Sequence, residues 1–158
     1  MKKFMLLILL ATIFVACDYT KEALELNPDI EITYINPLAW LTWAGDSLYA
    51  ATIDEIHFVP VNSLDSYLKE YTISYYINDS LVYGPTSPLA IYGKISGIVT
   101  QGAVDTFKLL NVPVPLGPAR DRLGPNETAK AVLRFVAFDE YFENSDTASV
   151  WFGIWMMN

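Results

Sequence analysis

The pattern of apolar and polar positions changes character at Ile30. From there onward, short runs rich in Val, Ile, Thr, Tyr, Phe and Trp alternate with clusters of Gly, Pro, Asn and Asp. Such runs are typical of β-strands separated by turns, and no segment keeps the 3.6-residue period of a long helix. The pattern predicts eight strands: Ile30–Ile35, Asp54–Pro60, Glu70–Ile77, Ser80–Tyr83, Ala90–Thr100, Asp105–Val112, Ala129–Phe138 and Ala148–Trp155.

Two hairpins follow from the turn signals. Asn78 and Asp79 separate the strand that ends at Ile77 from the strand that begins at Ser80, and both residue types accept the positive φ that a two-residue hairpin turn needs. The last two strands are joined by an acidic turn that contains Asn and Ser. Seven or eight short strands with frequent turns predict an all-β, two-sheet sandwich over residues 30–158.

The C-terminal segment resembles the end of immunoglobulin-like and fibronectin type III domains. In those domains a turn with Pro and Gly leads into the penultimate strand, as in LGPNETAKAVLRF here. An acidic turn with Tyr and Asn then precedes the closing strand, as in DEYFENSD, although Phe142 stands where such turns often have Gly. The resemblance implies an immunoglobulin-like sandwich of about seven or eight antiparallel strands.

The N-terminus has a different pattern. Lys2 and Lys3 precede Phe4–Ala16, a 13-residue apolar stretch whose one polar residue is Thr12. A membrane-spanning helix needs about 20 apolar residues, so the stretch instead fits the hydrophobic region of a secretory signal peptide. The one cysteine of the chain, Cys17, follows this stretch directly.

Together these features resemble a bacterial lipoprotein signal peptide, with Val15 and Ala16 at the two positions before the cysteine. The resemblance implies that the thiol of Cys17 receives a diacylglyceryl group and that the signal is cut before it. Acyl chains such as palmitate then hold the protein in the bilayer, because each buried CH₂ adds about 0.8 kcal/mol of membrane affinity. A hydrophobic first element with a buried thiol, and secretion without lipid, are the alternatives.

This interpretation divides the chain into three parts. Residues 1–16 are a signal peptide, residues 17–29 a lipidated N-terminus and charged tether, and residues 30–158 the sandwich domain. It also predicts a location in the bacterial cell envelope, at the outer membrane or cell surface rather than the inner membrane.

Charge narrows the choice of partner. Once Lys2 and Lys3 are removed, eight of the ten Lys and Arg remain against 18 Asp and Glu, so the formal charge is near −10. We expect no nucleic-acid partner, because phosphate binding needs a basic face. Two of the few arginines, Arg120 and Arg122, lie in the loop GPARDRLGP and are expected to pair with nearby acids.

Catalytic patterns are scarce in this chain. Glu55 and His57, the one histidine, share a strand face because alternate residues of a strand point the same way. No G-x-S-x-G turn accompanies them, and a histidine without a special role on a sheet face is the plainer interpretation. With one histidine and a lipidated Cys17, the ligands of a zinc site are missing. We expect no catalytic residue.

The last hairpin turn is the one candidate for a metal. Hard cations prefer clustered oxygen ligands, so calcium is a candidate cofactor there, although the spacing matches no EF-hand loop. A solvated acidic turn is the alternative, and no other cofactor is predicted. The acidic residues are Asp139, Glu140, Glu143 and Asp146.

Aromatic residues offer a candidate binding surface. Trp151 and Trp155 share one face of the last strand, roughly 13 Å apart, and form a platform that can stack on sugar rings or anchor a protein. Trp40 and Trp43, in the segment PLAWLTWAG, either join this platform or belong to a cover that packs against it. The second case makes these aromatics part of the core.

We therefore expect a membrane-anchored envelope lipoprotein that acts as a non-catalytic binding or structural module. Its partners are the lipid bilayer, through Cys17, and a glycan or an envelope protein. Two alternatives remain open: a hydrolase that uses pairs of carboxylates on loops, and a subunit of an envelope complex.

Overall fold

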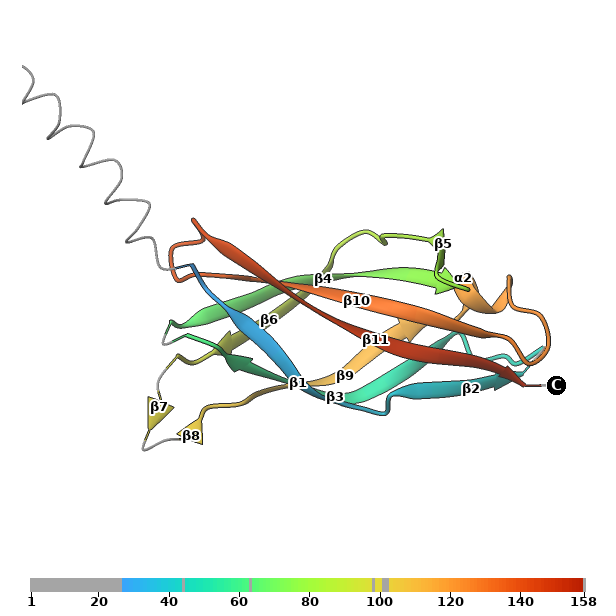
Figure 1. The fold of residues 1–158 in the computed structure, drawn as a ribbon, viewed down its shortest axis with the longest axis horizontal. Coiled ribbons are helices and arrows are strands. Elements are labelled where there is room, and N and C mark those ends of the chain that lie inside the picture. The colour runs from blue at the N-terminus through green and yellow to red at the C-terminus, as the bar shows by residue number, and fades with distance from the viewer. Residues whose placement is uncertain (1–26, 44, 63, 98, 101–102, 158) are drawn as a thin grey trace, which may run out of the picture.

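A computed structural model describes residues 27–43, 45–62, 64–97, 99–100 and 103–157 (Figure 1). The predicted signal peptide, Cys17 and most of the tether lie outside these ranges. The described chain forms one short helix, α2 (Gly117–Arg120), and the following strands: β1 (Ile30–Asn36), β2 (Ala39–Trp43), β3 (Ala50–Pro60), β4 (Ser66–Ile77), β5 (Ser80–Tyr83), β6 (Leu89–Ile95), β7 (Val99–Thr100), β8 (Ala103–Val104), β9 (Phe107–Pro115), β10 (Thr128–Phe138) and β11 (Ser145–Met157).

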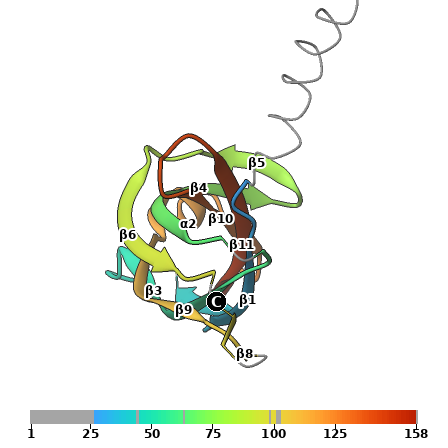
Figure 2. The same cartoon turned by 90° about the vertical axis from the view of Figure 1, so that its left-hand side faces the viewer.

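The predicted two-sheet sandwich is confirmed. One sheet has the order β1-β3-β9, and the other has the order β2-β11-β10-β4-β5, with β6 also paired to β4. Seen end-on, β4 and β10 form one side of the sandwich, and β3 and β9 form the other (Figure 2). With β1, β3, β4, β9, β10 and β11 as strands A, B, C, E, F and G, this is the strand order of an immunoglobulin-like sandwich.

The first strand changes sheets at Pro37. β1 pairs antiparallel with β3 in the smaller sheet, whereas β2 pairs parallel with β11 in the larger one. Proline has no N–H to donate, so the ladder of β1 cannot continue through this position. The sequence pattern did not predict β2, because a five-residue strand shows little periodicity and its partner lies more than 100 residues away.

Both predicted hairpins are present. Asn78 and Asp79 have φ values of 49° and 60° and join β4 to β5, as the turn chemistry requires. β10 and β11 pair in register from Thr128 with Trp155 to Phe138 with Ser145. Most of the predicted strands have other boundaries in the structure. β3 and β4 each begin four residues earlier than predicted, and β11 extends further at both ends. The run Ala90–Thr100 is β6 followed by β7, and β9 begins at Phe107 and continues to Pro115.

Aromatic side chains fill the space between the sheets. Phe58 from β3 meets Phe135 from β10 edge-on with ring centroids 5.0 Å apart, and Tyr71 stacks on the same Phe135 at 5.3 Å. Tyr75 is buried, and its hydroxyl donates to the carbonyl oxygen of Pro115 in the other sheet over 2.7 Å. Burial raises the pKa of the Tyr75 hydroxyl, and the neighbouring Tyr83 and Tyr71 raise it further. The core therefore contains a hydrogen bond between the layers.

The loop that carries Arg120 corrects one expectation. Arg120 Nη1 donates to the carbonyl oxygens of Asp46 and Leu48 over 2.7 and 2.8 Å, and Arg122 Nη1 donates to that of Pro118 over 2.8 Å. Both guanidinium groups thus bind backbone carbonyls rather than the nearby carboxylates. Carbonyls left unpaired where a loop turns away from a strand are strong acceptors for a charged donor.

Candidate functional site

The outer face of the larger sheet exposes an unusual set of apolar side chains. Along β11, Phe152 and Ile154 point into the core, so Trp151 and Trp155 point outward, and each exposes about half of its surface (52% and 51%). Beside them, Leu41 and Trp43 point outward from β2, with Trp43 50% exposed. We call this surface the tryptophan face; it comprises Leu41, Trp43, Trp151, Trp155 and Met157.

Gly153 shapes the tryptophan face. A Cβ at this position would lie 3.0 Å from the Cβ of Ala39 and 3.2 Å from Nε1 of Trp155. Because Gly153 has no side chain, β2 can approach β11 closely. The indole of Trp155 can also lie against the backbone of Gly153, which lies between Trp151 and Trp155. The Gly153 N–H donates to the carbonyl oxygen of Leu38 over 2.9 Å, which fixes this approach.

Trp40 and Trp43 have different environments. Trp40 is half-buried and packs against the core, with its indole Nε1 buried and without a hydrogen-bond partner. Trp43 faces outward and stands opposite Met157 in the parallel pairing of β2 and β11. β2 therefore extends the face beside β11 instead of covering it.

A hollow of about 600 Å³ adjoins the tryptophan face on the same sheet. Arg134 lies among its lining residues, and the strand register places Thr72 of β4 and Ser149 of β11 directly opposite it. We call this site the hydroxyl hollow, because six of its side chains carry hydroxyl groups: Thr72, Ser74, Tyr76, Ser145, Thr147 and Ser149.

Arg134 differs from the other cationic residues that the structure describes. Each of the others has a partner: Lys94 pairs with Asp65, Lys108 with Glu55 and Lys130 with Asp79, Arg120 and Arg122 bind carbonyls, and Lys69 lies over aromatic rings. Among the described residues, no acceptor binds the Arg134 guanidinium, not even Glu70 nearby on β4. Arg134 is also the one charged residue in the lining of the hydroxyl hollow.

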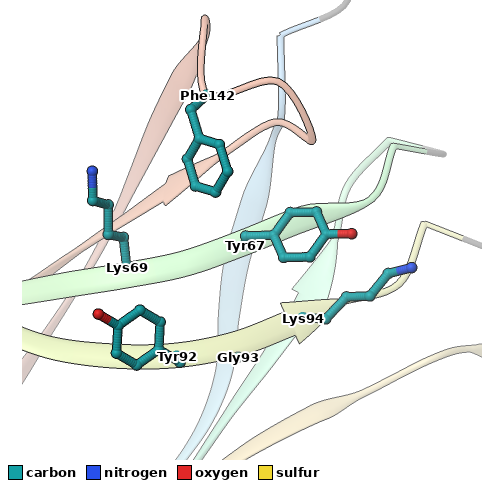
Figure 3. A pocket seen from close by; sticks show the side chains of 6 residues that line it. All are labelled: Tyr67, Lys69, Tyr92, Gly93, Lys94 and Phe142. Carbon is teal, nitrogen blue, oxygen red and sulfur yellow. The ribbon is translucent and has the colours of Figure 1, made fainter.

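A second hollow, of about 570 Å³, lies where β4, β6 and the β10–β11 turn meet (Figure 3). Tyr67 and Lys69 come from β4, Tyr92 comes from β6 and is 89% exposed, and Phe142 descends from the turn. Lys69 Nζ lies 4.9 and 5.8 Å from the ring centroids of Phe138 and Phe142, within cation–π range. We call this site the aromatic hollow.

Phe142 has an unusual backbone conformation for its residue type. Its φ is +58°, although the side chain is bulky and 55% exposed. L-residues other than Gly, Asn and Asp seldom adopt positive φ, because Cβ then crowds the carbonyl oxygen. The sequence signal for this strain was Phe142 itself, at a position where related turns often have Gly.

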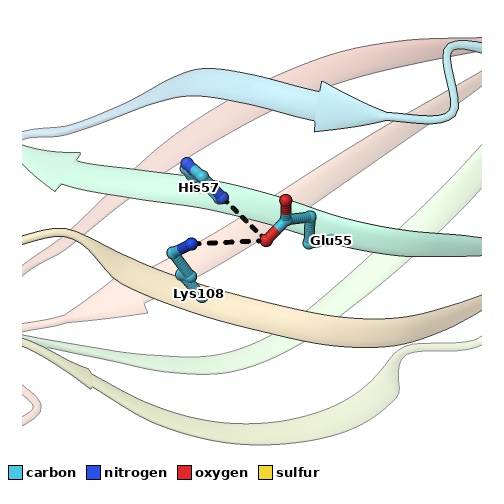
Figure 4. A network of polar contacts seen from close by, with 3 residues as sticks. All are labelled: Glu55, His57 and Lys108. Carbon is cyan, nitrogen blue, oxygen red and sulfur yellow. Dashed lines mark hydrogen bonds and ion pairs between the residues drawn. The ribbon is translucent and has the colours of Figure 1, made fainter.

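On the smaller sheet, Glu55, His57 and Lys108 form a charged cluster (Figure 4). His57 Nε2 lies 3.0 Å from Glu55 Oε2 without the alignment of a hydrogen bond, and Lys108 Nζ lies 3.5 Å from the same oxygen. The contact with His57 is the main cause that lowers the pKa of the Glu55 carboxyl; partial burial opposes it and Lys108 reinforces it. The ring of Tyr34 packs on His57 at 4.5 Å.

The acidic turn uses its carboxylates for turn hydrogen bonds. Burial tends to raise the pKa of Asp139, but backbone N–H groups of Glu143 and Asn144 and the amide of Asn144 donate to it, so its pKa is lowered overall. The carboxylate of Asp146 accepts a hydrogen bond from the backbone N–H of Ile30 over 2.9 Å. The described residues contain no group of three or more His, Cys, Asp or Glu arranged to hold a metal ion.

Comparison with models of protein families and with curated protein sequences finds no match for this chain. The fold class thus rests on the strand order, and the site rests on its own geometry. Among the residues that the structure describes, no helix is long and apolar enough to cross a bilayer. The predicted lipidation at Cys17 falls outside the described residues.

Proposed function

We propose that this chain is an envelope lipoprotein whose sandwich domain binds a glycan, without catalysis, through the outer face of the larger sheet. Acyl chains on Cys17 and the tether that follows hold the domain at the membrane. The observation that carries the proposal is the exposure of Trp43, Trp151 and Trp155 on one face of two neighbouring strands.

The chemistry of this face suits a sugar. Indole rings give broad apolar surfaces on which the C–H groups of a sugar ring can stack. Hydroxyl side chains beside them both donate and accept hydrogen bonds, as sugar hydroxyls do. A soluble domain seldom leaves several large apolar side chains together on its surface unless they contact a partner.

The test compares wild-type protein with the double variant Trp151→Ala/Trp155→Ala on an oligosaccharide array, both as full chains in detergent. We expect the double variant to lose at least about 30-fold in affinity for the oligosaccharides that wild type retains, since buried tryptophans each contribute about 2 kcal/mol or more at binding sites. Tyr141→Ala, which removes an exposed aromatic from the β10–β11 turn, away from the tryptophan face, is the control and should bind as wild type does.

An envelope protein is the second candidate partner, and the apolar side chains of Leu38, Leu41 and Met157 at the edge of the tryptophan face favour it. If this is the partner, no oligosaccharide is retained, and the double tryptophan variant instead loses an envelope protein that cross-links to wild type in cells. Intact mass of the native protein tests the anchor: a mass that includes Met1 contradicts cleavage before Cys17.

A further inference from the structure

Arg134 has an environment that the tryptophan face does not explain. The chain carries a formal charge of −8, with 18 acidic residues against ten basic ones. A guanidinium in such a chain finds carboxylates easily, yet among the described residues none pairs with Arg134. The hollow around it is lined by hydroxyl and apolar side chains, so the local charge there is positive within an acidic protein.

The strand register places neutral side chains at the positions directly beside Arg134. Val132 and Val136 flank its stem on the same face of β10, while Thr72 and Ser149 stand on either side across the ladder. Trp151 pairs with Val132, which makes it the diagonal neighbour of Arg134, at a distance of about 7–8 Å for such positions. One ligand can therefore stack on Trp151 and reach the guanidinium.

We infer that Arg134 and the hydroxyl hollow form the subsite for the carboxylate of an acidic sugar, so that the glycan bound by this face contains uronic acid residues. This inference rests on the proposed function. The guanidinium presents paired N–H donors in the geometry of a carboxylate, and it stays charged at every physiological pH. The surrounding hydroxyls bind the neutral part of the same sugar ring.

The charge of the whole protein does not oppose this selectivity at close range. Exposed charges farther away than about 8 Å are largely screened at physiological ionic strength. The hydrogen bonds from Arg134 to a carboxylate are charge-assisted and form at contact distance, where screening is weakest. An acidic glycan is therefore held by the local positive charge of the hollow.

An acidic protein segment is the competing ligand, and the lining of the hollow disfavours it. An Asp or Glu side chain carries a carboxylate for the guanidinium but no hydroxyl group beside it, so only peptide N–H and C=O groups would be left to pair with the six surrounding hydroxyls. A sugar acid carries both a carboxylate and hydroxyls on one rigid ring, so it satisfies both kinds of lining group together.

The experiment measures the affinity of the full chain in detergent for matched pairs of oligosaccharides, uronic acid oligomers and their neutral counterparts, with sulfated oligomers and polyglutamate as further probes. Wild type should prefer the uronic acid member by roughly 10- to 100-fold, the range that charge-assisted hydrogen bonds supply. Arg134→Met should abolish that preference while binding of the neutral member changes little.

Two further variants make the assignment specific. Ser149→Glu places a carboxylate directly opposite Arg134 and should also abolish the preference, whereas Ser149→Gln should reduce it less. Lys130→Met removes a cation from the same face of the same strand, but one that already pairs with Asp79 at 3.0 Å. It should keep the preference for the uronic acid member.

Several outcomes overturn the inference. If Arg134→Met keeps the preference for the uronic acid oligomer, Arg134 does not belong to the site. If Lys130→Met loses this preference as much as Arg134→Met does, the preference comes from the overall charge of the face and not from Arg134. If sulfated oligomers or polyglutamate bind more strongly than uronic acid oligomers, the ligand of the site is not a uronic acid. These results leave sugar binding by the tryptophans intact, whereas failure to bind any oligosaccharide overturns the proposed function as well.

Discussion

Two charged sites on the outer faces of this sandwich, one on each sheet, differ in how their polar groups are paired. On the smaller sheet, His57 and Lys108 both contact one carboxylate, Glu55, and Tyr34 covers the imidazole. On the larger sheet, Arg134 has no partner within the described residues, and the tryptophans beside it leave half of their surface in solvent. Strand alternation places side chains outward on both sheets, so the difference lies in whether these groups bind one another.

This contrast suggests how to separate a structural face from a binding face. A cluster that satisfies its own charges gains little from a ligand, because a new contact must first break an existing one. Groups left unpaired on a rigid sheet carry no such cost, and the backbone ladder already fixes their positions. This difference supports the proposal that the outer face of the larger sheet binds a partner.

The largest expected effect comes from breaking the tryptophan face at Gly153. In Gly153→Val the added side chain collides with Ala39 and Trp155, so β2 must move away from β11. We expect the free energy of unfolding to fall by about 1–3 kcal/mol, as for other overpacked sites, and glycan affinity to fall with it. Chemical denaturation measures the first and the oligosaccharide array the second.

Gly117→Ala provides the matched control for Gly153→Val, because a Cβ at Gly117 meets nothing within 4 Å. It should leave both stability and binding close to those of wild type. Similar losses in the two variants would show that the close approach of β2 to β11 does not determine the geometry of the face.

A smaller effect is expected from relieving backbone strain beside the larger sheet. Phe142 (φ +58°) and Asn111 (φ +55°), which lies on the smaller sheet, share the left-handed conformation, but asparagine tolerates it and phenylalanine does not. Phe142→Gly should raise the free energy of unfolding by about 0.5 kcal/mol, net of its lost ring contacts. Asn111→Gly should give no gain, and a larger gain in Asn111→Gly would contradict the strain at Phe142.

The smallest effect is expected at Glu55, and it depends on pH. Because the folded state lowers the pKa of this carboxyl below its usual 4.5, the charged form stabilises the fold above that pH, and the contribution disappears as the pH falls further. When the pH is lowered from neutral to below 4.5, wild type should therefore lose slightly more stability than Glu55→Gln. Thermal melts of both proteins at several pH values between neutral and acidic measure the difference.

Arg134→Met is the control from the other sheet for this experiment. Since no carboxylate pairs with Arg134 among the described residues, its removal should leave the pH dependence of stability close to that of wild type. If Arg134→Met changes the pH dependence of stability as much as Glu55→Gln does, the sites around Glu55 and Arg134 do not differ in how their charges are paired.

Features that depend on neighbouring residues could be predicted from the sequence, whereas pairings between distant segments could not. Alternation along SVWFGIW predicts that Trp151 and Trp155 share a face, and Asn78-Asp79 predicts its hairpin, because both depend on neighbouring residues. β2 could not be predicted in this way, since its partner is at the other end of the chain.

The isolation of Arg134 is also invisible in the sequence. It depends on the register of three strands, which brings Thr72 and Ser149 rather than acids to its two sides. The pairing of Arg120 was mispredicted for the same reason, because its acceptors are carbonyl oxygens more than 70 residues away. Charge counts describe the whole chain, whereas a binding site depends on which charges remain unpaired.

The hydrogen bond from Ile30 to Asp146 has a consequence for the orientation of an anchored protein. It places the entry of the chain into the sandwich at the first residues of β11, the same end as the β10–β11 turn (Figure 1). Trp155 lies nine residues farther along that strand, about 30 Å away at the rise of a β-strand. If the chain is anchored at Cys17, as we propose, the aromatic hollow lies at the end of the domain where the tether enters, and Trp155 lies at the far end. The length of β11 would then separate the tryptophan face from the end of the domain at which the tether enters.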